Sequence, residues 1–275
     1  MDDFTRAAWL GRTEEVYDLL DQSHVSRVAA TLGTPAPEQG AALPALWHWA
    51  FFQSATEEWC LGPDGHPVVG AFLAPPAGRS RMWAGGRVTF LEPLRIGIEA
   101  TRASSVLKVE EKTGTSGSLL FVTVRHEYRQ QGRVAIREEQ DIVYREPSPA
   151  KLTSAQPLTS GHWRAAVEPT AVLLFRYSAV TCNAHRIHYD LPYATQVEGY
   201  PGLVVQGPLI ATLTVGAFCR ANPTAHLRHF AFRGMRPLIA PHCFEVGGRI
   251  SEPGVAQTWA GDESGLAQSS EIHFD

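Results

Sequence analysis

The central part of the chain alternates apolar and polar residues with a period of two. The pattern runs through residues 87–93, 98–112, 118–130 and 133–146, and glycine-containing turns separate the four stretches. Alternation at this period places successive side chains on opposite faces of a strand. It predicts four antiparallel strands, each with one face buried and the other in solvent.

Residues 3–33, at the start of the chain, show a different spacing. Apolar side chains recur there at intervals close to a helical turn, at Phe4, Ala7, Val16, Leu19 and Leu20. This spacing predicts one or two short helices.

A second apolar segment follows a break rich in proline and glycine. Residues 44–59, PALWHWAFFQSATEEW, carry aromatic side chains from Leu46 to Trp59, and Pro44 suits the first turn of a helix. We therefore expect a largely buried helix here. Residues 61–86 contain several turn signals in succession, and they predict a long loop of the kind that often serves as a lid or a binding loop.

Residues 146–163 are rich in proline and serine and interrupt the strand pattern. We interpret them as a linker between two units, residues 1–150 and residues 151–275. The second unit repeats the first in outline: a strand at 171–179, a helix that begins at Pro208, and then four strands. We expect those strands near residues 226–236, 243–250, 254–261 and 269–274.

The composition narrows the class of protein. The chain has 275 residues, of which 44% are hydrophobic and 19% charged, and its formal net charge is −4. This charge provides no global basic field for nucleic acid. No apolar run approaches the roughly 20 residues that span a membrane, and the amino terminus, MDDFTRAAW, is acidic where a secretory signal would be basic. We expect a cytoplasmic protein.

The four cysteines do not suggest a disulfide or zinc framework. Because they are scattered without CxxC spacing, we expect reduced thiols that are mostly buried. The four are Cys60, Cys182, Cys219 and Cys243.

The strongest candidate site lies within residues 175–213. Asn183 and His188 stand five positions apart after an apolar run, and the pair Gly207-Pro208 opens a second apolar run with the composition of a helix start. His185, His188 and Asp190 could be metal ligands, but no distant third-ligand motif accompanies them and we assign no metal. A nucleophilic role for Cys182 is weaker, because nothing in the sequence indicates a lowered pKa for this thiol.

These residues carry a resemblance to a known family. The run NAHRIHYDLPYA, followed by GLVVQGPLIA, resembles the hydratase signature of the MaoC-like enoyl-thioester hydratases and dehydratases. The segments PALWHWAFF, LGPDGHPVVGAFL and RMWAGGRVTF are similar to the amino-terminal part of the double-hot-dog branch, which includes mesaconyl-C4-CoA and itaconyl-CoA hydratases. The resemblance implies an α+β fold, a double hot-dog with two central helices, each wrapped by a curved antiparallel sheet. It places the catalytic pair in the second hot-dog only.

The resemblance also assigns roles to individual residues. His188 falls on the family's histidine, Asn183 on its acidic position, and Gly207 on the glycine whose backbone N–H holds the thioester carbonyl. Two departures matter: Asn183 replaces an aspartate, and His185 stands where single-domain members usually carry asparagine. No cofactor is implied.

The asparagine decides how the chemistry is divided. Hydration of an unsaturated thioester needs a base for water, an acid for the α-carbon and donors for the thioenolate oxygen. Because an amide cannot take up a proton near neutral pH, His188 must be the base and return the proton as acid. Asn183 would then orient the water or fix the imidazole, and Gly207 would donate to the oxyanion.

The expected reaction is the reversible hydration of a short carboxylated enoyl-CoA, mesaconyl-C4-CoA or itaconyl-CoA, to a β-hydroxyacyl-CoA such as citramalyl-CoA. Arg186 is the nearest candidate for the substrate carboxylate, and Arg81 and Arg87 could serve the acyl group or the coenzyme A phosphates. Three alternatives remain: a (3R)-hydroxyacyl-thioester dehydratase for apolar chains, a non-catalytic acyl-CoA-binding protein, and a thioesterase. We expect a homo-oligomer, most simply a dimer.

Overall fold

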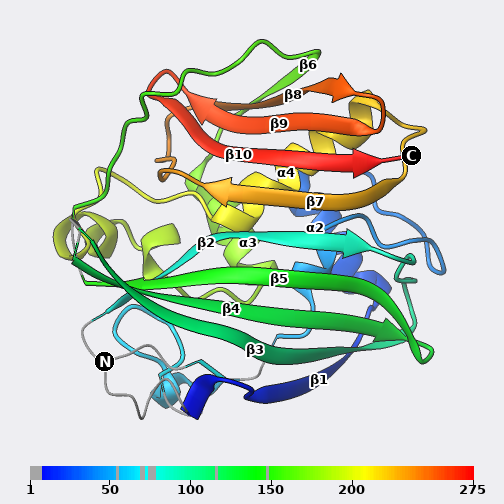
Figure 1. The fold of residues 1–275 in the computed structure, drawn as a ribbon, viewed down its shortest axis with the longest axis horizontal. Coiled ribbons are helices and arrows are strands. Elements are labelled where there is room, and N and C mark those ends of the chain that lie inside the picture. Colours follow the sequence, from blue (N-terminus) through cyan, green and yellow to red (C-terminus); the bar gives the residue numbers. More distant parts are fainter. Residues whose placement is uncertain (1–7, 54–55, 69–71, 74–78, 115–116, 147–148) are drawn as a thin grey trace.

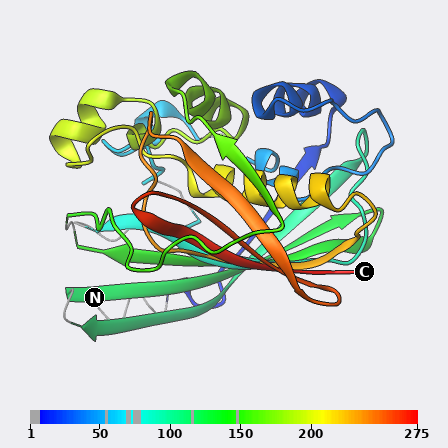
Figure 2. The same cartoon turned by 90° about the horizontal axis from the view of Figure 1, so that it is seen from above.

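The computed structural model forms one large antiparallel sheet with helices on one face (Figures 1 and 2). Among the described residues the sheet has ten strands in the order β1-β3-β4-β5-β2-β7-β10-β9-β8-β6. The structure describes residues 8–53, 56–68, 72–73, 79–114, 117–146 and 149–275.

The first half supplies five neighbouring strands of this sheet. They are β1 (Thr13–Leu19), β2 (Ser80–Phe90), β3 (Glu99–Gly114), β4 (Gly117–Gln130) and β5 (Arg133–Arg145). The four strands predicted from the alternating pattern are confirmed, although β2 begins seven residues earlier than expected. Side chains of β4 alternate between buried and half-buried positions, as the period of two requires.

The helical prediction for residues 3–33 is only partly correct. The helix α2 (Gln22–Leu32) is confirmed; the Asp21 side chain caps its first turn, and Gly33 ends it in the left-handed region. Val16 and Leu19 instead belong to β1, which pairs with β3. A few apolar positions do not distinguish the two periods, and pairing with an edge of the sheet decided the outcome. Phe4 and Ala7 lie outside the described residues.

The prediction of a buried helix over residues 44–59 is wrong. Among the residues of this segment that the structure describes, the helical parts are two short 3₁₀ turns, Trp47–Ala50 and Glu58–Cys60. Leu46 and Phe52 both have positive φ, so the backbone leaves the helical region on either side of the first turn. The expected burial is correct for its centre, because Trp47 and Trp49 are buried, whereas Trp59 is exposed.

The second half supplies the other five strands and the longest helix. Its four predicted strands are confirmed, and β6 was not predicted. The elements are β6 (Trp163–Val167), α3 (Ala171–Val180), α4 (Gly207–Ala221), β7 (Leu227–Gly234), β8 (Phe244–Glu252), β9 (Val255–Asp262) and β10 (Gly265–Phe274).

The strand predicted at residues 171–179 is the helix α3, so that prediction is wrong. A continuous apolar run of this length is compatible with either a buried strand or a helix. Thr170 decides between them locally, because its hydroxyl accepts a hydrogen bond from the Leu173 N–H at 3.1 Å and caps the first turn.

A seam between β2 and β7 joins the two halves. The strands pair antiparallel from Gly85 opposite Arg233 to Thr89 opposite His229. The same hydrophobic cluster contains Val88 of β2 and Phe230 of β7, together with residues of α4. Residues 149–162 form neither helix nor strand. The boundary at residue 150 stays a prediction, since the two halves share a sheet and a core.

The helix α4 crosses the inner face of the second half (Figure 2). Pro208 lies in its first turn, where a missing N–H costs nothing. Leu209, Val215 and Phe218 are buried. Among the described helices, none is long and apolar enough to cross a membrane.

Candidate active site

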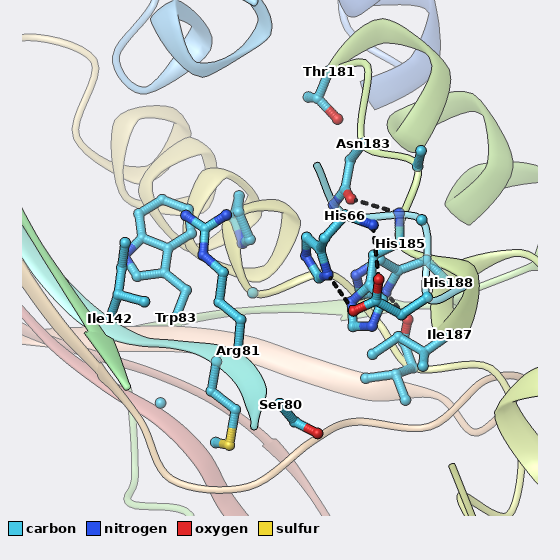
Figure 3. A pocket seen from close by; sticks show the side chains of 18 of the residues that line it. His66, Ser80, Arg81, Trp83, Ile142, Thr181, Asn183, His185, Ile187 and His188 are labelled. Atoms are coloured by element: carbon cyan, nitrogen blue, oxygen red, sulfur yellow. Dashed lines mark hydrogen bonds and ion pairs between the residues drawn. The ribbon is translucent and has the colours of Figure 1, made fainter. Parts of the chain in front are cut away.

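The candidate residues gather at one large cavity that both halves line. Its volume is about 1370 Å³. From the second half it receives Asn183, His185, His188 and Gly207, and from the first half it receives β2 and the loop before it. Figure 3 shows the histidines grouped on one wall and Arg81 on the facing wall.

His188 has the geometry of a neutral base. It ends the 3₁₀ turn Arg186–His188 and is buried. Its Nδ1 donates a hydrogen bond to the Val204 carbonyl at 2.7 Å, which leaves Nε2 as the nitrogen with a lone pair. Burial lowers the pKa of His188 to about 4, even though the bond to Val204 acts in the opposite direction. The ring is therefore neutral at pH 7.

Asn183 lies at the same cavity and shapes the turn that carries the histidines. Its Oδ1 accepts a hydrogen bond from the His185 N–H at 3.1 Å, and its own N–H donates to the Ser178 carbonyl at the end of α3. This local turn is what an asparagine commonly provides. The side-chain amide nitrogen has no partner among the described residues and stays available to a ligand.

Gly207 begins α4 at the cavity wall. The preceding residue, Gln206, is fully buried, and its Nε2 donates to the Leu174 carbonyl and to Ser178 Oγ, which fixes the helix start against α3. A Cβ added at Gly207 would meet no protein atom within 4 Å. The open space therefore lies over backbone N–H groups that have no partner within the helix, where the helix dipole favours negative charge.

A loop of the first half docks against this turn. Gly65 has a φ of +89° and lies so close to Ala184 that a Cβ there would come within 1.9 Å of the Ala184 carbonyl oxygen. The Arg186 N–H donates to the Asp64 carbonyl oxygen at 2.9 Å. Only a glycine tolerates this backbone and this approach together.

The docked loop brings an aspartate and a histidine that sequence reasoning had not assigned to the site. The Nδ1 of His66 and Oδ2 of Asp64 are 2.9 Å apart. The ring of His66 lies 4.2 Å from that of His185, which lies 5.3 Å from that of His188, as measured between centroids. The only signal in the sequence was the run LGPDGHP in a loop predicted to be functional.

These groups strongly perturb one another. Partial burial raises the pKa of Asp64, but hydrogen bonds from His66 outweigh it and bring that pKa to about 2. Burial, with His66 and His188 nearby, lowers the pKa of His185 to about 2. Asp64 is thus a carboxylate, and His185 is neutral, at pH 7.

The geometry does not favour Arg186 as the receptor of a substrate carboxylate. Its guanidinium pairs with Asp190 at 2.7 Å, donates to the Pro63 carbonyl and lies over the ring of Tyr193. It is absent from the cavity wall. Arg186 instead ties the docked loop to the histidine turn, and its role toward substrate stays a prediction.

Of the two other arginines considered, only Arg81 reaches the cavity. Among the described residues it has no ion pair or hydrogen-bond partner, and its charge contributes to the lowered pKa of His185. Arg87 is paired with Glu139 and Asp141 instead.

The metal set considered from the sequence does not assemble, since Asp190 is held by Arg186 and by the Tyr193 N–H. A different group, Asp64, His66 and His185, offers ligand atoms within 4.8 Å of one another. Two of its members are already joined by a hydrogen bond, which accounts for their proximity without a metal.

The expectation of mostly buried thiols is wrong. Cys182 and Cys243 are exposed, and Cys60 and Cys219 are half-buried. Cys182 is exposed because it stands in the tight turn after α3, with a positive φ of 49°.

The sequence is similar to known proteins over most of its length. Residues 46–240 match the family model of hydroxyacyl-thioester dehydratase type 2. The chain is 45% identical to mesaconyl-C(4)-CoA hydratase of Chloroflexus aurantiacus over 84% of each chain. It is 28% identical to the mitochondrial hydroxyacyl-thioester dehydratase type 2 of Schizosaccharomyces pombe, over 86% of this chain and 89% of the relative.

Solved structures agree on the fold. A MaoC-like dehydratase from Phytophthora capsici superposes with a TM-score of 0.70 at 12% identity, over 96% of this chain and 94% of that one. The predicted double hot-dog is confirmed, with the short 3₁₀ turn noted above in place of the helix expected from Pro44. The chain belongs to the family of type 2 hydroxyacyl-thioester dehydratases, and it is a hydro-lyase of the enoyl-thioester type.

Proposed function

We propose that this protein hydrates a short carboxylated enoyl-CoA, mesaconyl-C4-CoA or itaconyl-CoA, to citramalyl-CoA in a reversible reaction. The observation that carries the chemistry is the state of His188: buried, neutral, and committed through Nδ1 to Val204, so that Nε2 is the basic atom at the cavity. The similarity to mesaconyl-C(4)-CoA hydratase supports the choice of acyl group.

In the proposed reaction, His188 Nε2 takes a proton from water as the oxygen attacks the β-carbon. The electrons of the double bond move toward the thioester, and the N–H groups at Gly207 stabilise the resulting thioenolate. Asn183 orients the water through its side-chain amide. Conjugation of the double bond with the thioester makes mesaconyl-C4-CoA the better substrate, whereas itaconyl-CoA first requires a proton shift.

The carboxylated substrate needs a cation near the β-carbon, and Arg81 is our candidate. It reaches the cavity wall opposite the histidines (Figure 3) and has no partner among the described residues. A guanidinium matches a carboxylate in a bidentate geometry. Arg81 takes the role first assigned to Arg186, which remains tied to Asp190.

The test is a mass-spectrometric turnover assay with mesaconyl-C4-CoA, itaconyl-CoA and crotonyl-CoA. Wild type should add the mass of water to the carboxylated substrates. Arg81→Met should lower kcat/KM for them by about 100-fold, the loss of one charged hydrogen-bonded contact, and should change turnover of crotonyl-CoA little. Arg87→Met, on the outer surface, serves as the matched control. Equal losses on crotonyl-CoA would contradict the role of Arg81.

The second candidate is a dehydratase of (3R)-hydroxyacyl thioesters with longer apolar chains. One feature of the cavity favours this candidate. The part lined by the first half includes the aromatic residues Trp49, Phe52 and Tyr128, against which an apolar acyl chain could lie. Turnover of crotonyl-CoA and longer enoyl-CoAs alone would select this candidate. Release of free coenzyme A would indicate a thioesterase, and binding without turnover would indicate a non-catalytic protein.

We also propose a cytoplasmic homodimer that acts in itaconate degradation. The outer strands β1 and β6 are the two edges of the sheet among the described residues, and a partner could cover one of them. Light scattering coupled to size exclusion will give the oligomeric state.

A further inference from the structure

The proposed hydration must also deliver a proton to the α-carbon, a step that the sequence alone assigned to His188. His188 receives a proton from water, yet the α-carbon must also gain one, and Asn183 cannot supply it. In a site with a protonated carboxylic acid beside the histidine, that second acid would be at hand. Here the asparagine removes it, so an acid must come from elsewhere in the cavity or His188 must serve twice.

We propose that the Asp64–His66 pair, contributed by the first half, is the second proton-transfer group of the site and protonates the α-carbon from His66 Nε2. The inference rests on the proposed hydration. With this role, the first half of the chain, which lacks the Asn183–His188 pair, also supplies a catalytic residue.

The first support is the hydrogen bond within the pair. An ionised carboxylate can only accept, so Asp64 Oδ2 must receive the Nδ1–H of His66 across their 2.9 Å separation. That fixes the tautomer and leaves Nε2 as the reactive nitrogen. The carboxylate also holds the imidazole in a fixed orientation, as the aspartate of a catalytic triad does.

The second support is the way in which the loop is held. The Asp64 backbone is bonded to the Arg186 N–H, and the carbonyl of Pro63 is bonded to the Arg186 side chain. Gly65 packs directly on Ala184. Contacts of backbone with backbone fix position far better than two flexible side chains would. His66 is therefore placed at the cavity by the same turn that carries His188.

The third support is the row of three rings. His185 lies between His66 and His188, in contact with both (Figure 3). During hydration the C–O bond forms at the β-carbon, His188 gains a proton from water, and His66 loses one to the α-carbon. His185, neutral at pH 7, or a water beside it, can pass the proton from His188 back to His66. One water is consumed, and the enzyme returns to its starting state.

The experiment compares His66→Gln and Asp64→Asn with wild type in the hydration of mesaconyl-C4-CoA. Because the glutamine cannot transfer a proton, we expect kcat of His66→Gln to fall by roughly 100- to 10,000-fold. Asp64→Asn should fall by a smaller factor, and the double variant should be no slower than His66→Gln alone, since the two act as a unit. His226→Gln, an exposed histidine, is the matched control.

Binding and folding must be measured beside the rates. Calorimetry with methylsuccinyl-CoA, a saturated analogue, should give a Kd within about twofold of wild type for His66→Gln, and thermal unfolding should be unchanged. For His66→Gln, a kcat within threefold of wild type would overturn the inference. A Kd that rises by the same factor by which kcat/KM falls would also overturn it. If the wild type hydrates none of the enoyl-CoA substrates, both the proposed function and this inference are wrong. If the wild type and His66→Gln are both active, only the inference about His66 is wrong.

Discussion

The two halves of the molecule each bury a group that titrates, and they treat it in opposite ways. In the first half the carboxylate of Glu138 accepts hydrogen bonds from Trp49, Tyr128 and Gln140 and pairs with His48. In the second half the imidazole of His188 makes one hydrogen bond, through Nδ1, and its Nε2 has no partner among the described residues.

The two buried groups differ in how much of their hydrogen-bonding capacity is used. Burial raises the pKa of Glu138, but hydrogen bonds and the charge of His48 bring it to about 2, so this carboxylate is ionised and fully occupied. A base whose lone pairs are all engaged cannot activate water, whereas His188 keeps one free. Two polar interiors in one fold can therefore serve stability in one half and chemistry in the other.

The largest effect that tests this comparison is expected on the catalytic rate when His188 is replaced. His188→Gln should lower kcat by roughly 100- to 10,000-fold because it removes the general base, while the free energy of unfolding changes far less. Steady-state hydration kinetics and urea unfolding measure the two quantities. A variant that retains wild-type turnover would place the base elsewhere.

The next effect concerns stability in the first half. Glu138→Ala should reduce the free energy of unfolding by about 3–5 kcal/mol, because it leaves buried His48, Trp49 and Tyr128 without their acceptor. Glu139→Ala, at the neighbouring half-buried position where the carboxylate pairs with Arg87 and Arg125, should cost less, about 1 kcal/mol. Urea unfolding of both variants gives the comparison, and equal costs would show that burial and saturation add nothing.

The smallest effect is on the pH dependence of stability, and there the halves should look alike. Burial lowers the pKa of His126 in the first half and of His188 in the second to about 4. Between pH 6.5 and 4 the unfolded chain binds protons that the folded chain does not, so stability falls as the pH falls. Each histidine should contribute at most about 1.4 kcal/mol per pH unit.

His126→Gln and His188→Gln should each flatten this dependence by a similar amount, as measured by urea unfolding at pH 7, 6 and 5. A difference confined to one variant would contradict the shared origin of the two shifts. Equal changes would mean that a lowered pKa alone does not distinguish a catalytic histidine from any other buried histidine.

Local pattern was enough to predict most strands, whereas Asn183, His188 and Gly207 were singled out by the family resemblance, and their roles stay predictions. Alternation with a period of two depends only on neighbouring residues, and the start of α4 depends on Pro208 and the residues beside it. Where the pattern was short, as in β1, pairing with the distant strand β3 decided the structure, and where it was uniformly apolar, as in α3, the cap at Thr170 decided it.

Local pattern could not predict all the residues of the site. Asp64 and His66 reach His185 because Gly65 permits a close approach to Ala184, and no local rule relates those two segments. The prediction that Arg186 binds the substrate carboxylate was drawn from its position within the motif. That position gave no information on Asp190 and Pro63, whose oxygen atoms accept hydrogen bonds from its guanidinium. Partners far apart in sequence decide whether a charged side chain is available.

The seam between β2 and β7 has a consequence for biosynthesis. The ribosome completes the first half long before β7 is made, so β2 waits with one row of backbone donors and acceptors unpaired. During that interval Trp83 and Arg81 on β2, and the loop with His66, have no second half to face. We expect the nascent first half to need a chaperone or rapid translation, and the active site to be among the last features of the molecule to form.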